Sequence, residues 1–330
     1  METRLFGNTD LRVSLIGFGA WAIGGPAMAA KTPIGWGEVN DEVSLKALRR
    51  AHELGVTFFD TADFYGLGHS EELIGRVFGN NARVVVATKV GHRLDDQGAI
   101  VLDYSKKHIL RACERSLRRL RRDQIDLYQL HSARIPHFEQ GECVEAMEKL
   151  RREGKVRHWG LSLNTFHPEA EAEFLMSRNL GHGFQLVLNI INQRALPLVK
   201  TASAKGYGII ARMPLQFGLL TGKITPGTSF PPNDHRSFRL TSEIIREVLN
   251  GLEELAPVES RHGLTKTSLA LSYCASIPGV STIIPGIRTP QQAEQNTAKI
   301  VQLTEEDLRV TKDLYERKFS AVVEMMEKRG

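Results

Sequence analysis

Four side chains that could move protons follow three successive strands predicted from the sequence. A β-branched and aromatic run, Val56–Phe59, ends at Asp60, and Tyr65 follows in a turn of small and polar residues. The next apolar run, RVVVATK, ends at Lys89, and the run IDLYQLH ends at His131. Because catalytic side chains of parallel α/β proteins lie at the carboxyl ends of their strands, we expect these four residues to meet on one face.

The chemistry that these four side chains suit is the reduction of a carbonyl group. A free tyrosine, with a pKa of about 10, is a poor acid at neutral pH, but an ammonium beside it stabilises the phenolate. Lys89 would supply that ammonium to Tyr65, and Asp60 would pair with Lys89. His131 could donate a hydrogen bond to an oxygen on which negative charge develops. None of the four can supply a hydride, so a cofactor must do so.

Helix and strand patterns alternate along the chain and predict the scaffold for these residues. Thr3–Val13 is expected to form a hairpin, Leu15–Gly19 the first barrel strand, and Ser70 the cap of the helix after Tyr65. Eight such strands predict one (β/α)8 TIM-barrel domain over residues 1–330, with an N-terminal β-hairpin and additional C-terminal helices in Thr304–Arg329. The other strands are expected at Thr57–Asp60, Arg83–Thr88, Ile125–Gln129, Val156–Leu161, Phe184–Leu188, Gly208–Ala211 and Ser281–Ile284. Helices are expected at Asp41–Leu54, Glu71–Phe78, Lys106–Leu120, Glu142–Glu153, Pro168–Arg178, Pro197–Lys205 and in a longer region after Ser242.

Composition and charge argue against several other classes of protein. Hydrophobic residues make up 42% of the chain and charged residues 25%, which is ordinary for a globular protein. Much of the net charge of +5 comes from Arg111–Arg122, which is expected to be a solvated helix face because neither aromatic residues nor a nucleic-acid motif accompany it. Three widely spaced cysteines predict neither disulfides nor a metal site. With no signal peptide or membrane-spanning run, a cytoplasmic protein is expected.

The segments that carry the four side chains resemble the catalytic signatures of the aldo-keto reductase family. They read FFDTADFYGLGHSEELIG, VVVATKVG and IDLYQLH, and the resemblance extends from LIGFGAW to IIPGIRTPQQAEQN, nearly the whole chain. It implies a barrel with NADPH across its carboxyl face and a tetrad of Asp60, Tyr65, Lys89 and His131. In that scheme Tyr65 is the general acid, and hydride passes from the nicotinamide to an aldehyde or ketone, or back from an alcohol.

The resemblance also implies contacts to the nicotinamide, with departures from the family pattern. Gln185 and Ser162 match residues that hold the carboxamide, whereas Leu163 replaces the usual asparagine and Asn164 could compensate for it. Arg212 stands where an aromatic residue normally stacks on the nicotinamide, a role that a planar guanidinium could fill. The full set expected to bind the cofactor is Gly19, Ala20, Trp21, Ser162, Leu163, Gln185, Arg212, Met213, Pro214, Leu215, Gly218, Gly222, Lys223, Gly286, Arg288, Gln292 and Asn296.

The phosphate and adenine contacts implied by the resemblance favour NADP(H) as the cofactor. The segment PLQFGLLTGK matches the part that lies along the pyrophosphate, with two glycines for close backbone approach and the positive charge of Lys223. Arg288 is expected to bind the 2′-phosphate and Asn296 the adenine. Gln292 stands where many members have an arginine, so NAD(H) stays open as an alternative.

The expected partner is a small-molecule carbonyl substrate, and the sequence does not decide the oligomeric state. Trp21, Phe64 and Trp36 are expected to line the substrate pocket. Gly222–Leu240, a long loop after the seventh strand, is of the kind that acts as a lid.

Other interpretations of the same residues remain open at this point. Singly, Asp60 could cap a turn, Tyr65 could be a surface aromatic residue, and Lys89 and His131 could serve in salt bridges at the barrel rim and hydrogen bonds in the core. Lys89 at the end of a barrel strand could also form a Schiff base in a lyase, although the cofactor-like segments would then lack a role. A cofactor-binding regulatory subunit with little turnover is a further alternative.

Overall fold

The eight main strands form one parallel sheet that closes on itself. In this computed structural model, which describes residues 1–329, the sheet order is β3, β6, β7, β10, β11, β12, β13 and β14. Parallel bridges from Ile16 to Ile283 and from Gly19 to Gly286 join the two ends of this order. The predicted (β/α)8 barrel is therefore confirmed. Its strands are β3 (Phe18–Gly19), β6 (Phe58–Asp60), β7 (Val85–Val90), β10 (Ile125–His131), β11 (Val156–Ser162), β12 (Gly183–Val187), β13 (Gly208–Arg212) and β14 (Thr282–Ile284).

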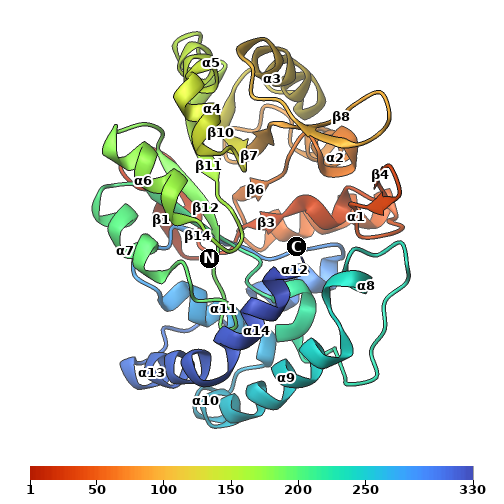
Figure 1. Ribbon diagram of the computed structural model, residues 1–330, viewed down its shortest axis with the longest axis vertical. Coiled ribbons are helices and arrows are strands. Elements are labelled where there is room, and N and C mark those ends of the chain that lie inside the picture. The colour runs from red at the N-terminus through yellow and green to blue at the C-terminus, as the bar shows by residue number, and fades with distance from the viewer. Residues whose placement is uncertain (330) are drawn as a thin grey trace.

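Helices connect successive strands and cover the outside of the barrel (Figure 1). The helix that holds the arginine-rich run, α3, begins where Ser105 accepts a hydrogen bond from the amide of His108. Its apolar side packs into the core, as Ile109 and Leu117 do, which leaves most of its arginines outside. The connecting helices are α1 (Asp41–Glu53), α2 (His69–Val77), α3 (Lys106–Leu120), α5 (Glu142–Arg152), α6 (Glu169–Ser177), α7 (Leu196–Ala204), α11 (Lys266–Ser276) and α12 (Pro290–Thr297).

A hairpin of β1 (Thr3–Leu5) and β2 (Arg12–Ser14) closes the amino end of the barrel, as predicted. Its loop inserts the buried Phe6 ring against the starts of β12 and β13. A Cβ at Gly183 or Gly208 would come within 2.3–2.5 Å of that ring, so only glycine leaves room for it. The hairpin side chains thus complete the small inner core of the barrel.

Further elements lie beyond the plain barrel. Small hairpins, β4 with β5 and β8 with β9, stand in the loops after β3 and β7, and η2 (Tyr65–Gly68) follows β6. Figure 1 shows the C-terminal helices α13 and α14 gathered with α9 and α10 along one side of the barrel. Across residues 1–329, no helix has both the length and the apolar character to cross a membrane. The additional elements are β4 (Met28–Ala29), β5 (Thr32–Pro33), β8 (His92–Leu94), β9 (Ile100–Leu102), α4 (Ile135–Gln140), α8 (Arg236–Arg239), α9 (Ser242–Leu252), α10 (Ala256–His262), α13 (Glu305–Leu314) and α14 (Ser320–Glu327).

The predicted capping role of Ser70 is wrong. Helix α2 begins at His69 after Gly68, and Ser70 lies inside its first turn. The Ser70 hydroxyl instead accepts a hydrogen bond from Thr61 and donates one to the carbonyl of Ala20, at 2.8 and 2.9 Å. Ser70 therefore links the loop after β3 to the loop after β6 through these two hydrogen bonds.

Candidate active site

Lys89 lies at the centre of the site and uses all three of its ammonium protons. Its Nζ donates to Asp60 Oδ2 at 2.6 Å, to the carbonyl of Thr61 at 2.8 Å and to Tyr65 Oη at 3.1 Å. The side chain is fully buried. Burial alone would lower the Lys89 pKa, but the Asp60 and Tyr65 groups beside it raise that pKa above its ordinary value. The ammonium is therefore held charged against the phenol oxygen.

Neighbouring strand ends bring these groups together. Asp60 and Lys89 lie at the carboxyl ends of the paired strands β6 and β7, and Tyr65 begins the 3-10 turn η2. That turn needs positive φ at Gly66, Leu67 and Gly68, and a Cβ at Gly66 would come within 2.0 Å of the Gly24 carbonyl oxygen. Close packing of the two loops thus fixes the direction of the Tyr65 ring.

The second oxygen of Asp60 is held by two side-chain amides. Gln185 donates to Asp60 Oδ1 at 2.7 Å, and Gln129 donates to the same oxygen at 3.2 Å. Both glutamines are buried on strands β12 and β10. Gln185, expected at the nicotinamide carboxamide, therefore also anchors the carboxylate that orients Lys89.

His131 lies at the end of β10, beside the Tyr65 ring. The two ring centroids are 5.9 Å apart in an edge-to-face arrangement. Burial, with His92, Lys89 and Arg212 nearby, lowers the His131 pKa well below its ordinary value. Its Nδ1 is buried without a hydrogen-bond partner among residues 1–329, and its backbone carbonyl accepts from the Tyr104 hydroxyl at 2.5 Å. A neutral imidazole thus stands next to the proposed acid.

A pocket of about 620 Å³ opens above these residues at the carboxyl end of the barrel. Its volume falls within the roughly 300–1,000 Å³ of ordinary ligand sites. Asp60, Tyr65 and His131 line it, whereas Lys89 lies beneath Tyr65. Of the expected cofactor residues, Ala20, Leu163 and Gly222 do not line this pocket. Those that do are Gly19, Trp21, Ser162, Gln185, Arg212, Met213, Pro214, Leu215, Gly218, Lys223, Gly286, Arg288, Gln292 and Asn296, and the expected substrate residues Trp21, Phe64 and Trp36 do so as well.

The residues that depart from the family pattern, Leu163 and Arg212, contact each other beside the pocket. Leu163 is buried in the core, and its carbonyl accepts from the Arg212 guanidinium at 3.2 Å. The side-chain oxygen of Asn164 accepts hydrogen bonds from the amides of Phe166 and His167 at 2.9 and 3.0 Å. The Arg212 guanidinium also reaches the Thr165 hydroxyl at 3.0 Å and so stays on the pocket wall.

The pocket has the unpaired polar groups that a dinucleotide would need. Arg212 Nε and Asn296 Nδ2 are buried without a hydrogen-bond partner in residues 1–329. Met213, Gln216, Phe217 and Gly218 all take positive φ, a concentration of strained backbone that is typical of ligand sites. A Cβ added at Gly218 would make only ordinary contacts, with Ile224 at 3.7 Å and Arg236 at 4.0 Å. These residues fit a nicotinamide dinucleotide.

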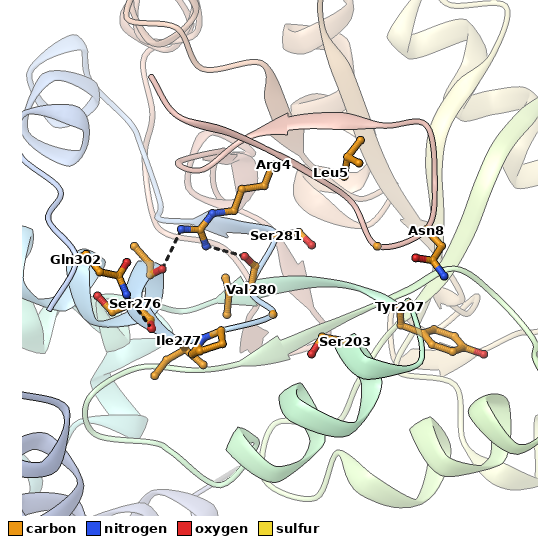
Figure 2. A pocket seen from close by; sticks show the side chains of 15 residues that line it. Arg4, Leu5, Asn8, Ser203, Tyr207, Ser276, Ile277, Val280, Ser281 and Gln302 are labelled. Carbon is orange, nitrogen blue, oxygen red and sulfur yellow. Dashed lines mark hydrogen bonds between the residues drawn. The ribbon is translucent and has the colours of Figure 1, made fainter. Parts of the chain in front are cut away.

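Another hollow, of about 450 Å³, lies at the opposite end of the barrel. Figure 2 shows its lining from the hairpin residues Arg4 and Asn8 and from Ser281, which precedes β14. The Arg4 guanidinium already donates to the carbonyls of Val280 and Ala275. The hollow is therefore remote from the strand ends that carry the four titratable residues.

Sequence reasoning missed the residues that the lid loop brings to the pocket. His235 is buried there, with its ring 4.7 Å from Trp21 in a stacked arrangement and 4.6 Å from Trp36 edge-on. The loop has no helical or strand periodicity that could point to this histidine. His92 also lines the pocket, and its ring centroid lies 4.4 Å from that of His131. A loop of the kind that acts as a lid was expected here, and its residues His235, Arg236, Phe238, Arg239 and Leu240 line the pocket.

Acidification from pH 7 to pH 5 is expected to destabilise the fold through the three pocket imidazoles. Burial lowers the pKa of His92 to about 4 and of His235 to about 3, and it lowers that of His131 too. Because the unfolded chain takes up protons near pH 6.5 and the folded chain does not, stability is lost as the pH falls below about 6.5. Each imidazole should cost about 1–2 kcal/mol of unfolding free energy over this range, measurable by urea denaturation.

The matched variant for this test is His235→Phe, which keeps a ring against Trp21 and Trp36. It should remove about a third of the pH dependence attributed to these imidazoles. An unfolding free energy that is equal at pH 7 and pH 5 in the unaltered protein would contradict the expectation.

The fold is a closed parallel barrel with a pocket at its carboxyl face, beneath which Asp60, Lys89 and Tyr65 are joined by hydrogen bonds. The model of the Aldo/keto reductase family matches residues 15–316, and the chain belongs to this family. Family members generally use nicotinamide cofactors and reduce carbonyl groups.

Relatives and solved structures cover almost the whole chain. The uncharacterized oxidoreductase YqkF of Bacillus subtilis is 30% identical, over 94% of this chain and 95% of its own length. The NADH-specific methylglyoxal reductase of Escherichia coli is 27% identical, over 94% and 97% of the two chains. The structure of the glycerol dehydrogenase AKR11B4 from Gluconobacter oxydans is similar with a TM-score of 0.79 at 27% identity, covering 96% of this chain and 95% of that one.

Proposed function

We propose that this protein reduces an aldehyde or ketone with NADPH, with Tyr65 as the general acid, and that it can run the reverse alcohol oxidation. The observation that carries the proposal is the Lys89 ammonium, bonded to Asp60 at 2.6 Å and to the Tyr65 hydroxyl at 3.1 Å under the pocket. When bound, the cofactor supplies the hydride.

The side chains of this protein provide the proton and the charge stabilisation. The carbonyl oxygen accepts hydrogen bonds from Tyr65 Oη and from the neutral His131 ring, which polarises the bond. As negative charge grows on that oxygen, Tyr65 gives up its proton. The resulting phenolate is stabilised by the Lys89 ammonium, whose position Asp60 fixes. Proton return to Tyr65 completes the cycle.

The same geometry argues against a Schiff-base lyase. A Schiff base needs a neutral, accessible amine. Lys89 Nζ is fully buried, all its protons are donated, and the adjacent Asp60 carboxylate favours its charged form. Tyr65 lines the pocket, whereas Lys89 does not.

Arg288 is proposed to read the 2′-phosphate, so Arg288→Ala should discriminate between the two cofactors. The Arg288 guanidinium lies on the pocket and donates to the carbonyls of Trp36 and Glu38 at 3.4 and 2.6 Å. A charge-assisted hydrogen bond contributes about 1.5–3 kcal/mol, so the variant should weaken NADPH about 10- to 100-fold and NADH little. Equal losses for NADPH and NADH would show that Arg288 does not contact that phosphate.

Intrinsic fluorescence offers a direct test of cofactor binding. Trp21 and Trp36 both line the pocket, so a dinucleotide should change their emission. Titration should give tighter binding of NADPH than of NADH. If neither dinucleotide binds, the reductase proposal fails, and if NADH binds more tightly, the cofactor assignment is reversed.

A further inference from the structure

The pocket has an excess of positive charge. Five cationic side chains line it, and Asp60 is the single acid in the lining described by residues 1–329. Asp60 is neutralised by Lys89 from below. Arg236 is paired with Asp234 at 2.6 Å. The other four, for which residues 1–329 place no carboxylate within 4.0 Å, are Arg212, Lys223, Arg239 and Arg288.

The proposed cofactor accounts for three of these four cations. Lys223 belongs to the segment expected along the pyrophosphate, Arg288 to the 2′-phosphate end, and Arg212 to the nicotinamide end. Arg239 remains, and it comes from the lid loop, at the end of α8. Its charge therefore lacks a counterpart in both the described chain and the proposed cofactor contacts.

Arg239 lies beside two aromatic side chains, and one of its nitrogens is buried. Its guanidinium lies 5.7 Å from the Phe217 ring centroid and 5.2 Å from that of Phe238. Its Nε is buried without a hydrogen-bond partner among residues 1–329. The Phe217 ring in turn packs 5.1 Å from His235. A planar guanidinium that packs beside aromatic rings suits a flat, singly charged carboxylate better than a lysine would, because it can donate two parallel hydrogen bonds.

We propose that Arg239 binds a carboxylate at the end of the carbonyl substrate that is remote from the reacting carbon. This assignment rests on the proposed carbonyl reduction and adds the substrate class to it. The carbonyl lies at Tyr65 and His131, and the carboxylate reaches the lid end of the same pocket. The preferred substrates are therefore oxo acids in which the carbonyl group and the carboxylate lie at opposite ends of the molecule.

Matched aldehydes test this proposal. The probes are 4-formylbenzoate, whose carboxylate lies across the ring from the aldehyde, and its neutral methyl ester. The unaltered protein should have a higher kcat/KM for the acid, by about tenfold, and salt should weaken that preference. Arg239→Gln should remove the preference through KM for the acid, with the ester unchanged within about twofold, and Arg239→Lys should restore part of it.

Controls separate a local contact from a general charge effect. Arg246→Gln removes the same charge from α9, where its side chain is 60% exposed, and should leave the acid-to-ester ratio unchanged. Calorimetric titration with 4-(hydroxymethyl)benzoate should show the same loss of binding in Arg239→Gln without turnover. NADPH affinity, measured by fluorescence, should not change in that variant.

Three outcomes would overturn the assignment, and they are distinguishable. Equal kcat/KM for acid and ester, unaffected by Arg239→Gln, would refute the carboxylate site and leave carbonyl reduction intact. A parallel loss for both aldehydes with weaker NADPH binding would place Arg239 on the cofactor. Failure of the unaltered protein to reduce either aldehyde would instead refute the proposed reaction itself.

Discussion

The Tyr65→Phe protein is expected to bind NADPH normally and to reduce aldehydes about a hundredfold to ten-thousandfold more slowly than the unaltered protein. The substitution removes the only phenolic hydroxyl in the pocket lining that residues 1–329 provide, and it keeps the ring that stacks 6.0 Å from Trp21. Lys89 keeps its bonds to Asp60 and to the Thr61 carbonyl, so the floor of the pocket stays in place. General acid catalysis contributes about 10²–10⁴-fold, which sets the expected loss of kcat.

Tyr128→Phe is the matched control for the loss of a hydroxyl. Tyr128 is fully buried on β10, and its hydroxyl has no hydrogen-bond partner among residues 1–329. Its replacement should leave kcat within about twofold, because no hydrogen bond is lost. If Tyr65→Phe kept more than a tenth of the aldehyde reduction rate, Tyr65 would not be the acid.

Lys89→Met should abolish reduction and also destabilise the fold. The methionine has a similar length but cannot donate, so the buried Asp60 carboxylate keeps only the amides of Gln129 and Gln185. Breaking a buried ion pair on one side costs about 3–5 kcal/mol of unfolding free energy, measurable by urea denaturation. The kcat should fall about a thousandfold or more, since the Tyr65 phenolate loses its cation.

The double variant Lys89→Met with Asp60→Asn separates stability from catalysis. Removing the stranded charge should recover most of the lost unfolding free energy. Reduction should stay abolished, because no ammonium faces Tyr65. Recovery of activity along with stability would mean that Lys89 acts only through the fold.

The central part of the site could be predicted from the sequence because parallel strands end at one edge. Once Asp60 and Lys89 were placed at the ends of adjacent strands, their pairing followed from geometry, and the structure gives it as a 2.6 Å contact. The (β/α)8 fold was predictable for the same reason, since strand and helix patterns alternate along the chain. The hydrogen bond from Gln185 to Asp60 could not be predicted, because no local sequence pattern shows to which acceptor a buried side-chain amide donates.

The lid and the local capping geometry could not be predicted from periodicity. Ser70 is a residue type that often caps helices, yet its hydrogen bonds with Thr61 and Ala20 accompany a position in the first turn of α2, one residue after the helix begins. His235 and Arg239 lie in a loop whose conformation depends on contacts with Trp21 and Phe217, far away in the sequence. Tertiary packing, and not local preference, decides such positions.

The measurement that tests the central claim most directly is isotope transfer in a single turnover. NADPH carrying deuterium at both C4 positions of the nicotinamide would be mixed with excess protein and benzaldehyde, and the alcohol analysed by mass spectrometry. We expect benzyl alcohol one mass unit heavier than the unlabelled product, formed by the unaltered protein and not by Tyr65→Phe. If no labelled alcohol forms from deuterated NADPH or deuterated NADH, hydride transfer to a carbonyl is not what this site does with benzaldehyde, and the proposed reaction is contradicted.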